Sequence, residues 1–182
     1  MADNGVRRSF EEVIGEEIDR LYRGALLLAG NDADQAERIL TTALVEARRG
    51  HNHESAGVDG SRLWLDTVLA RTFLSLEGAT NGGPDVPVSA PAPLDTAALP
   101  GGRLPPSIGL LALARTAAGL PPAHRVAVWL SLVGRRGTRE VGQILGTDEE
   151  AVTGLVGSGY RYMRNAILVG GSNRQAERRN ES

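Results

Sequence analysis

The stretch that most constrains the fold is residues 122–168, where apolar residues recur at helical spacing on both sides of a Gly-Thr-Asp sequence. We expect Thr138 to cap a short helix and Asp148 to cap a longer one, because both side chains accept hydrogen bonds from free backbone N–H groups. Gly146 should end the short helix, since glycine readily adopts the left-handed conformation there. The residues expected to face the core are Val126, Leu130, Val133, Val141, Ile144, Leu145, Val152, Leu155 and Val156.

This arrangement of a packing helix followed by two helices around a tight turn is the helix-turn-helix pattern of many DNA-binding proteins. An ordinary helical hairpin produces the same pattern of apolar residues and caps. The stretch therefore predicts helices, and it leaves both a DNA-reading unit and a plain hairpin open.

Composition narrows the class of protein. The chain has 182 residues, no cysteine and a formal charge of −2, and all of its basic residues are arginine. Without cysteine there are no disulfides or thiolate metal sites, and a charge near zero gives no overall attraction to nucleic acid. Because it has neither a membrane-spanning apolar run nor a signal-peptide pattern at its N-terminus, we expect a cytoplasmic protein with no membrane contact.

Three amphipathic helices are expected in the N-terminal part, at about 10–29, 33–49 and 61–77. Ser9 followed by Glu12 predicts a capping box at the start of the first helix. Apolar stripes at helical spacing predict that the three helices pack as a bundle. The stripe of the third helix comprises Trp64, Leu65, Val68, Leu69, Phe73 and Leu76.

A change of composition divides the chain after these helices. Residues 78–106 are dense in Pro, Gly and Ala, which predicts a flexible linker. We therefore expect an all-α fold of two small bundles: a helical domain at 9–77, the linker, and a helix-turn-helix domain at 107–168. The polar residues 169–182 are expected to form a disordered tail.

This layout resembles the bacterial RNA polymerase sigma factors of the extracytoplasmic-function group. In the first domain the resemblance is carried by LYRGALLLAGNDADQAERILTTALVEA and SRLWLDTVLARTF, and in the second by LPPAHRVAVWLSLVGRRGTREVGQILGTDEEAVTGLV. It covers nearly the whole chain from Phe10 to Leu168. It implies a helical domain that binds polymerase and opens promoter DNA, followed by a helix-turn-helix domain that reads an upstream promoter element.

The resemblance also implies which side chains form contacts. The clamp helices of the RNA polymerase core would bind the outer face of the second helix, at Asp34, Glu37, Arg38 and Thr41. Promoter DNA would be contacted by hydroxyl and arginine side chains in the third helix and the C-terminal domain. These residues are Arg62, Arg71, Arg135, Arg136, Thr138, Arg139, Thr153, Ser158 and Arg161.

The sequence departs from the family on these same surfaces. Arg38 stands where the family has an acidic residue, which would weaken docking on polymerase unless Arg38 pairs with Asp34 or Glu37 on its own helix. The expected recognition helix has no cation before Arg161. Since phosphate contacts provide most of the affinity for DNA, we expect weak binding of DNA by the chain alone. Gly154 and Gly157 would let another backbone approach closely, which favours a protein contact.

Three classes of function remain to be compared. The first is a working sigma factor, and the second is a sigma-like adaptor or mimic that binds an anti-sigma factor or another regulator with little DNA binding. The third, an enzyme, is not expected, because no nucleophile–base pair or phosphate-binding glycine loop is present. His51 and His53 form only a weak metal signal without a third ligand. We therefore expect no cofactor and no metal.

Overall fold

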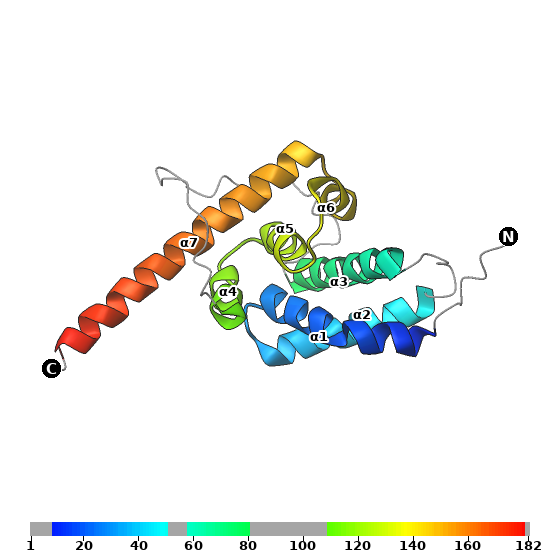
Figure 1. The fold of residues 1–182 in the computed structure, drawn as a ribbon, viewed down its shortest axis with the longest axis horizontal. Coiled ribbons are helices and arrows are strands. Elements are labelled where there is room, and N and C mark those ends of the chain that lie inside the picture. Colours follow the sequence, from blue (N-terminus) through cyan, green and yellow to red (C-terminus); the bar gives the residue numbers. More distant parts are fainter. Residues whose placement is uncertain (1–8, 51–57, 81–108, 181–182) are drawn as a thin grey trace.

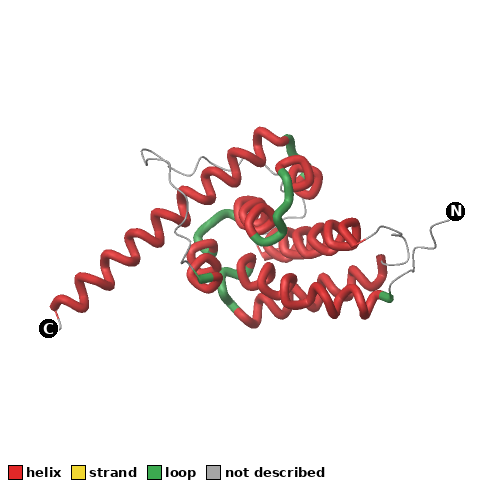
Figure 2. The backbone as a smooth tube through the Cα atoms, in the orientation of Figure 1, coloured by secondary structure: helices red, strands yellow, loops and turns green. Residues whose placement is uncertain are grey.

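The computed structural model describes residues 9–50, 58–80 and 109–180, and within this part α-helices joined by short turns are the regular secondary structure, with no strand (Figures 1 and 2). The expected all-α fold class is thus confirmed. The N-terminal half contains α1 (Phe10–Leu28), α2 (Ala33–Gly50) and α3 (Val58–Thr80). The C-terminal half contains α4 (Leu110–Ala117), α5 (Pro122–Leu132), α6 (Thr138–Leu145) and α7 (Glu149–Asn180).

The helices begin and end where capping chemistry places them. The Ser9 hydroxyl accepts from the backbone N–H of Glu12 at 3.2 Å, and the Glu12 carboxylate accepts from that of Ser9 at 2.9 Å. The Asp32 carboxylate caps α2 by accepting from the backbone N–H of Gln35 at 3.0 Å. The expected capping box of α1 is therefore confirmed.

Two helices are longer than the sequence predicts. α3 begins three residues before Ser61 and continues to Thr80, which includes the first residues of the expected linker. α7 continues to Asn180, into the segment where a disordered tail is expected, and its last turns project from the body (Figure 1). No proline interrupts either extension, so each added residue gains a backbone hydrogen bond at a small propensity cost. Residues 81–108, most of the expected linker, lie outside the described residues.

The two halves share one hydrophobic core. α1 packs on α2, α3, α4 and α5, and α3 packs on α5 and α6 (Figure 1). Phe73 of α3 and Trp129 of α5 are both fully buried in this common core. Two modules joined only by a linker would each have a separate core. In this structure the C-terminal helices instead pack directly on α1 and α3.

A close approach of α1 and α5 sets the spacing of the halves. A Cβ atom built on Gly24 would lie 2.4 Å from the indole Nε1 of Trp129, so only glycine leaves room for this ring. Arg125 of α5 strengthens the same contact. Its Nη1 donates to the carbonyl oxygen of Leu28 at 2.9 Å, and its guanidinium lies 5.6 Å from the centre of the Phe73 ring.

Candidate interaction surfaces

The side chains expected to bind polymerase lie together on the outside of α2. Asp34, Glu37, Arg38 and Thr41 are all exposed and are spaced to share one face of the helix. The opposite face of α2 is buried through Ala36, Ile39, Leu40 and Ala43. Arg38 forms no ion pair with any described residue, so the alternative pairing with Asp34 or Glu37 on its own helix is not present. Its charge is available to a partner.

The turn between α6 and α7 has the expected geometry. Gly146 takes the left-handed conformation at φ 69°, and the Asp148 carboxylate accepts from the backbone N–H of Ala151 at 2.7 Å. Thr138 is the first residue of α6 and not its cap, because the cap position is Gly137. The Thr138 hydroxyl instead donates to the Glu149 carboxylate at 3.1 Å, which ties the start of α6 to the start of α7.

The three arginines around the α5–α6 turn have different surroundings. Arg135 and Arg139 are exposed and form no ion pair among the described residues. The side chain of Arg136 is only 12% exposed, and its Nη2 lies 2.9 Å from Oδ2 of Asp66. Arg135 has a left-handed backbone at φ 52°, which is uncommon for a residue with a side chain. This turn directs neighbouring arginines to different environments.

The expected recognition helix presents little positive charge. The Thr153 hydroxyl donates to the carbonyl oxygen of Glu149 at 2.8 Å, and the Ser158 hydroxyl to that of Gly154 at 2.7 Å. Arg161 is exposed two turns further along the helix. Exposed acids surround its first turn, namely Asp148, Glu149 and Glu150. They stabilise the positive end of the helix, but they repel a phosphate backbone.

The two α3 arginines expected to contact DNA also differ. Arg62 is half-exposed, and its Nε donates to Oε1 of Glu17 at 2.6 Å. Arg71 is exposed and forms no ion pair with a described residue. Of the nine expected DNA contacts, only Arg71, Arg135, Arg139 and Arg161 are exposed arginines without an ion pair in the described part of the chain.

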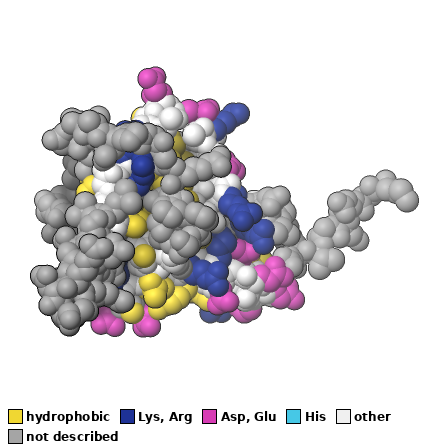
Figure 3. Space-filling model, turned by 60° about the vertical axis from the view of Figure 1, so that its left-hand side comes forward, with side chains coloured by type: hydrophobic (Ala, Val, Ile, Leu, Met, Phe, Trp, Pro, Cys, Tyr) yellow, Lys and Arg dark blue, Asp and Glu magenta, His cyan; other side chains and the backbone are white. Residues whose placement is uncertain are grey.

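A buried ion network, which the sequence reasoning missed, connects the two halves. Asp66 of α3 has no exposed side-chain surface and receives Arg20 of α1 at 2.5 Å and Arg136 at 2.9 Å, one on each carboxylate oxygen. Arg20 also donates to Glu17 at 2.6 Å. The signal available in the sequence was Asp66 within the apolar stripe of α3, because an acid on a buried face requires partners. Figure 3 shows arginine side chains gathered beside acidic ones on one face of the molecule.

Burial and ion pairing act in opposite directions on the carboxylates of this network. Burial raises the pKa of Asp66 above its ordinary value, although Arg20 and Arg136 both act to lower it. Burial also acts to raise the pKa of Glu17, but the hydrogen bonds from Arg20 and Arg62 outweigh it and the pKa lies below 4.5. Both arginines therefore stabilise the charged form of Asp66 against the effect of burial.

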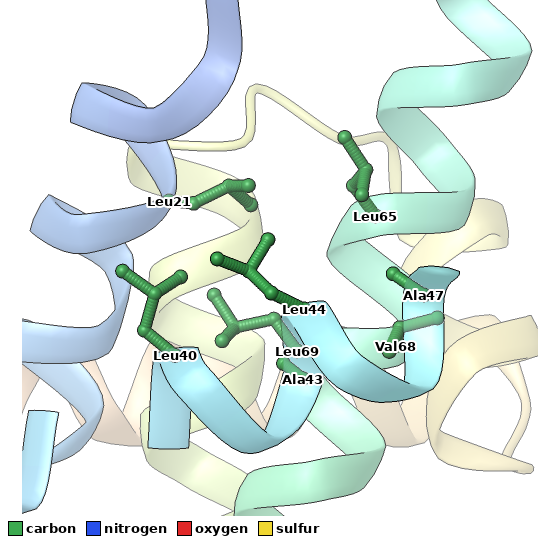
Figure 4. Close-up of a pocket in the computed structure, with 8 residues that line it drawn as sticks. All are labelled: Leu21, Leu40, Ala43, Leu44, Ala47, Leu65, Val68 and Leu69. Atoms are coloured by element: carbon green, nitrogen blue, oxygen red, sulfur yellow. The ribbon is translucent and has the colours of Figure 1, made fainter. Parts of the chain in front are cut away.

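The described residues offer a pocket without polar groups, and they contain no cluster of metal ligands. An apolar depression between α1, α2 and α3 is lined by eight residues, Leu21, Leu40, Ala43, Leu44, Ala47, Leu65, Val68 and Leu69 (Figure 4). It has no polar group to orient a ligand. Groups of three or more potential metal ligands are absent from the described ranges, and His51 and His53 lie outside them. Within those ranges no helix combines the length and apolar character that a membrane crossing needs.

Comparison with known proteins gives no family for this chain. No model of a known protein family matches the sequence, and no solved structure matches the fold significantly.

Proposed function

We propose that this chain is a sigma-factor-like transcription protein that binds RNA polymerase and promoter DNA to direct or modulate transcription initiation. The observation that carries the proposal is the α5–α6–α7 arrangement, with left-handed Gly146 and the Asp148 cap between the last two helices. A second observation supports it: the α2 residues at which the sequence resembles the polymerase-binding face all lie exposed on one side of that helix.

In this proposal, the α2 face formed by Asp34, Glu37, Arg38 and Thr41 docks on the clamp helices of core polymerase. Arg38 is free of ion pairs among described residues, so its charge acts directly on the partner. If the partner surface has the charge that the family's acidic residue would meet, Arg38→Asp strengthens the complex, because one repulsion becomes one attraction.

DNA contact is assigned to the exposed arginines at the α5–α6 turn, Arg135 and Arg139, with Arg161 further along α7. Two or three phosphate contacts give only weak binding, and the acids at the start of α7 reduce it further. The chain would therefore act on DNA within a complex with polymerase.

A second candidate function is a sigma-like adaptor or mimic that binds an anti-sigma factor or another regulator, with little DNA binding. Three observations favour it. Arg136 is occupied by Asp66, and the first turn of α7 presents acids where a DNA-reading helix presents cations. Gly154 has open space beside it, which leaves that side of α7 accessible to a protein.

The deciding experiment combines co-purification with core polymerase and transcription from a library of promoter fragments. Specific transcripts that are lost in an Arg135→Gln/Arg139→Gln variant support the proposed function. Arg115→Gln is the matched control, since Arg115 is also an exposed arginine of the C-terminal half. Polymerase or regulator binding without any transcript supports the adaptor. Failure to bind polymerase or any transcription regulator contradicts both.

A further inference from the structure

Thr138 stands out among the hydroxyl groups of the chain because two arginines precede it, in the order Arg135, Arg136, Gly137, Thr138. No other serine or threonine of the 182 residues has arginine at both the second and the third position before it. Protein kinases select acceptor hydroxyls partly through charge patterns of this kind, since acidic groups of the kinase bind the cations beside the acceptor. The sequence around Thr138 is therefore that of a phosphate acceptor for an arginine-directed kinase.

The structure presents this acceptor at the surface. Thr138 and Arg135 are exposed, the three residues before Thr138 are not helical, and Gly137 is extended at φ −71° and ψ 159°. Arg136 is bonded to Asp66, so Arg135 is the arginine that a kinase can reach. Because an acceptor enters a kinase active site as an extended segment, only the first turn of α6 has to open. Helix ends open more easily than helix interiors.

A phosphate on Thr138 would lie beside the two exposed arginines that the proposed function assigns to DNA. Arg135 is three residues before Thr138 and Arg139 is the next residue, and neither forms an ion pair among the described residues. Three residues span at most about 10 Å, which long arginine side chains can cover. A phosphothreonine carries a charge of about −1.5 to −2 at pH 7, so it can occupy both guanidinium groups as a DNA phosphate would.

The same phosphate would remove a bond between α6 and α7. The Thr138 hydroxyl donates to the Glu149 carboxylate at 3.1 Å. The oxygens of a phosphate monoester accept hydrogen bonds, so this bond is lost on phosphorylation and two anions face each other. Exposed acids at the start of α7 already repel a DNA backbone, and the added anion extends this repulsion to the start of α6.

We propose that Thr138 is a phosphorylation site whose modification switches off DNA contact at the α5–α6 turn. In the reaction, Oγ of Thr138 attacks the γ-phosphorus of ATP held by a separate serine/threonine kinase. The new O–P bond replaces the bond to the β–γ bridging oxygen, ADP leaves, and the hydroxyl proton passes to a carboxylate base of the kinase. This inference depends on the proposed function, because it regulates the arginines to which that function assigns DNA contact.

The first test locates the accepted phosphate. The full chain is incubated with ATP and an arginine-directed serine/threonine kinase domain, and mass spectrometry of its peptides identifies the modified residue. We expect one phosphate per chain, on Thr138, and none in Thr138→Ala. Thr41 is exposed and has Arg38 three residues before it, but it lies in the middle of α2 and should stay unmodified. Arg135→Gln should lose most of the incorporation, and Arg115→Gln, another exposed arginine variant, should keep it.

The second test measures binding to a fluorescent mixed-sequence duplex over a range of salt concentrations, before and after kinase treatment. Phosphorylation should lower the slope of log affinity against log salt by about 1.8, because two contacts of about 0.9 each are lost. Kinase treatment should leave the slope of Thr138→Ala unchanged. The Arg135→Gln/Arg139→Gln variant should give the same low slope without any kinase. Far-UV circular dichroism checks that the helices are retained in each protein.

The outcomes separate this inference from the proposed function. Phosphate on other residues, or on none, overturns the inference and leaves the proposed function standing. Phosphate on Thr138 with an unchanged salt slope also overturns it, while a low slope in Arg135→Gln/Arg139→Gln still supports DNA contact at the turn. If neither form of the protein binds DNA, the inference is overturned together with direct DNA contact, and the adaptor is favoured.

Discussion

Two neighbouring arginines of this protein lie in different environments. Arg135, with φ 52°, is exposed, whereas the next residue, Arg136, contacts Asp66. Sequence reasoning treats the two residues alike, since both are arginines in a polar turn. Only the three-dimensional position of Asp66, 70 residues away in sequence, distinguishes them.

The first prediction concerns the charge of Glu17, whose side chain is 5% exposed and receives both Arg20 and Arg62. Glu17→Gln should lower the free energy of unfolding at pH 7 by about 3 kcal/mol, as expected when one partner of a buried pair is removed. The folded-state pKa lies below 4.5, so the contribution is complete above that pH and is lost as the pH falls through the folded value. Urea unfolding should therefore show the two proteins converging in stability as the pH falls below the ordinary glutamate pKa.

Glu11→Gln is the control for this experiment, because Glu11 is exposed and its contact with Arg48 is long, at 3.9 Å. Glu11→Gln should change the free energy of unfolding by less than about 1 kcal/mol at any pH. A difference between Glu17→Gln and wild type that persists unchanged at low pH would show that altered packing, and not the ion pairs, is responsible.

The second prediction concerns two glycines of the same helix. Gly24→Ala forces the Trp129 ring to shift and should destabilise the protein by about 1–3 kcal/mol. Gly15→Ala fills open space and should stabilise α1 by about 1 kcal/mol, since alanine is the better helix former. Thermal unfolding of the two variants should move the midpoint in opposite directions. Equal shifts of the two unfolding midpoints would mean that Trp129 of α5 does not pack against Gly24 in solution.

At the scale of the helices, sequence reasoning performs well because its signals are local. Ser9, Gly146 and Asp148 act through bonds to residues at most a few positions away, so composition and spacing reveal them. Thr138 was placed wrongly as a cap, because Gly137 takes the extended conformation before α6 and moves the boundary by one residue. The sequence also predicts too short a helix in α7, because the polar composition of residues 169–182 favours a disordered tail, whereas the helix continues to Asn180.

The third prediction tests the Asp148 cap. Asp148→Ala should lower the free energy of unfolding by about 1 kcal/mol, because the backbone N–H of Ala151 loses its acceptor. Asp148→Asn keeps a side-chain acceptor and should lower the free energy of unfolding much less. Comparison of the two variants therefore separates the effect of the capping hydrogen bond from the effect of the charge. Chemical denaturation measures both variants. A loss for Asn as large as that for Ala would assign the effect to charge at the helix end and not to the hydrogen bond.

At the level of the whole molecule, the sequence predicts two helical bundles but not how they lie relative to each other, and the structure packs the two halves together. Apolar stripes predicted which face of each helix is buried, and Val126, Leu130, Val141, Val152 and Phe73 are buried accordingly. They did not predict which helix covers which, because an apolar face fits any other apolar face of similar size. The specific contacts are made by Arg125, Arg136 and Trp129, whose partners are distant in sequence.

The fourth prediction follows from the shared core. Each half has one tryptophan, Trp64 in α3 and Trp129 in α5. Trp129→Phe and Trp64→Phe therefore give proteins whose fluorescence reports one half each. In each protein, the urea midpoint by fluorescence should coincide with its own midpoint by circular dichroism, as for a single cooperative unit. Separate midpoints would show that the halves unfold independently.

The contact between Arg125 and Leu28 has a consequence for how the chain matures. α1 has no basic residue in its last turn, and the side-chain donor to its carbonyl end comes from 97 residues later. A nascent chain that has left the ribosome up to the end of α3 thus has its first three helices but lacks Trp129 over Gly24 and the second arginine on Asp66. The apolar surface of α1 to α3 therefore stays exposed until the C-terminal helices have been synthesised. Completion of the fold is therefore expected only after synthesis has passed Arg136.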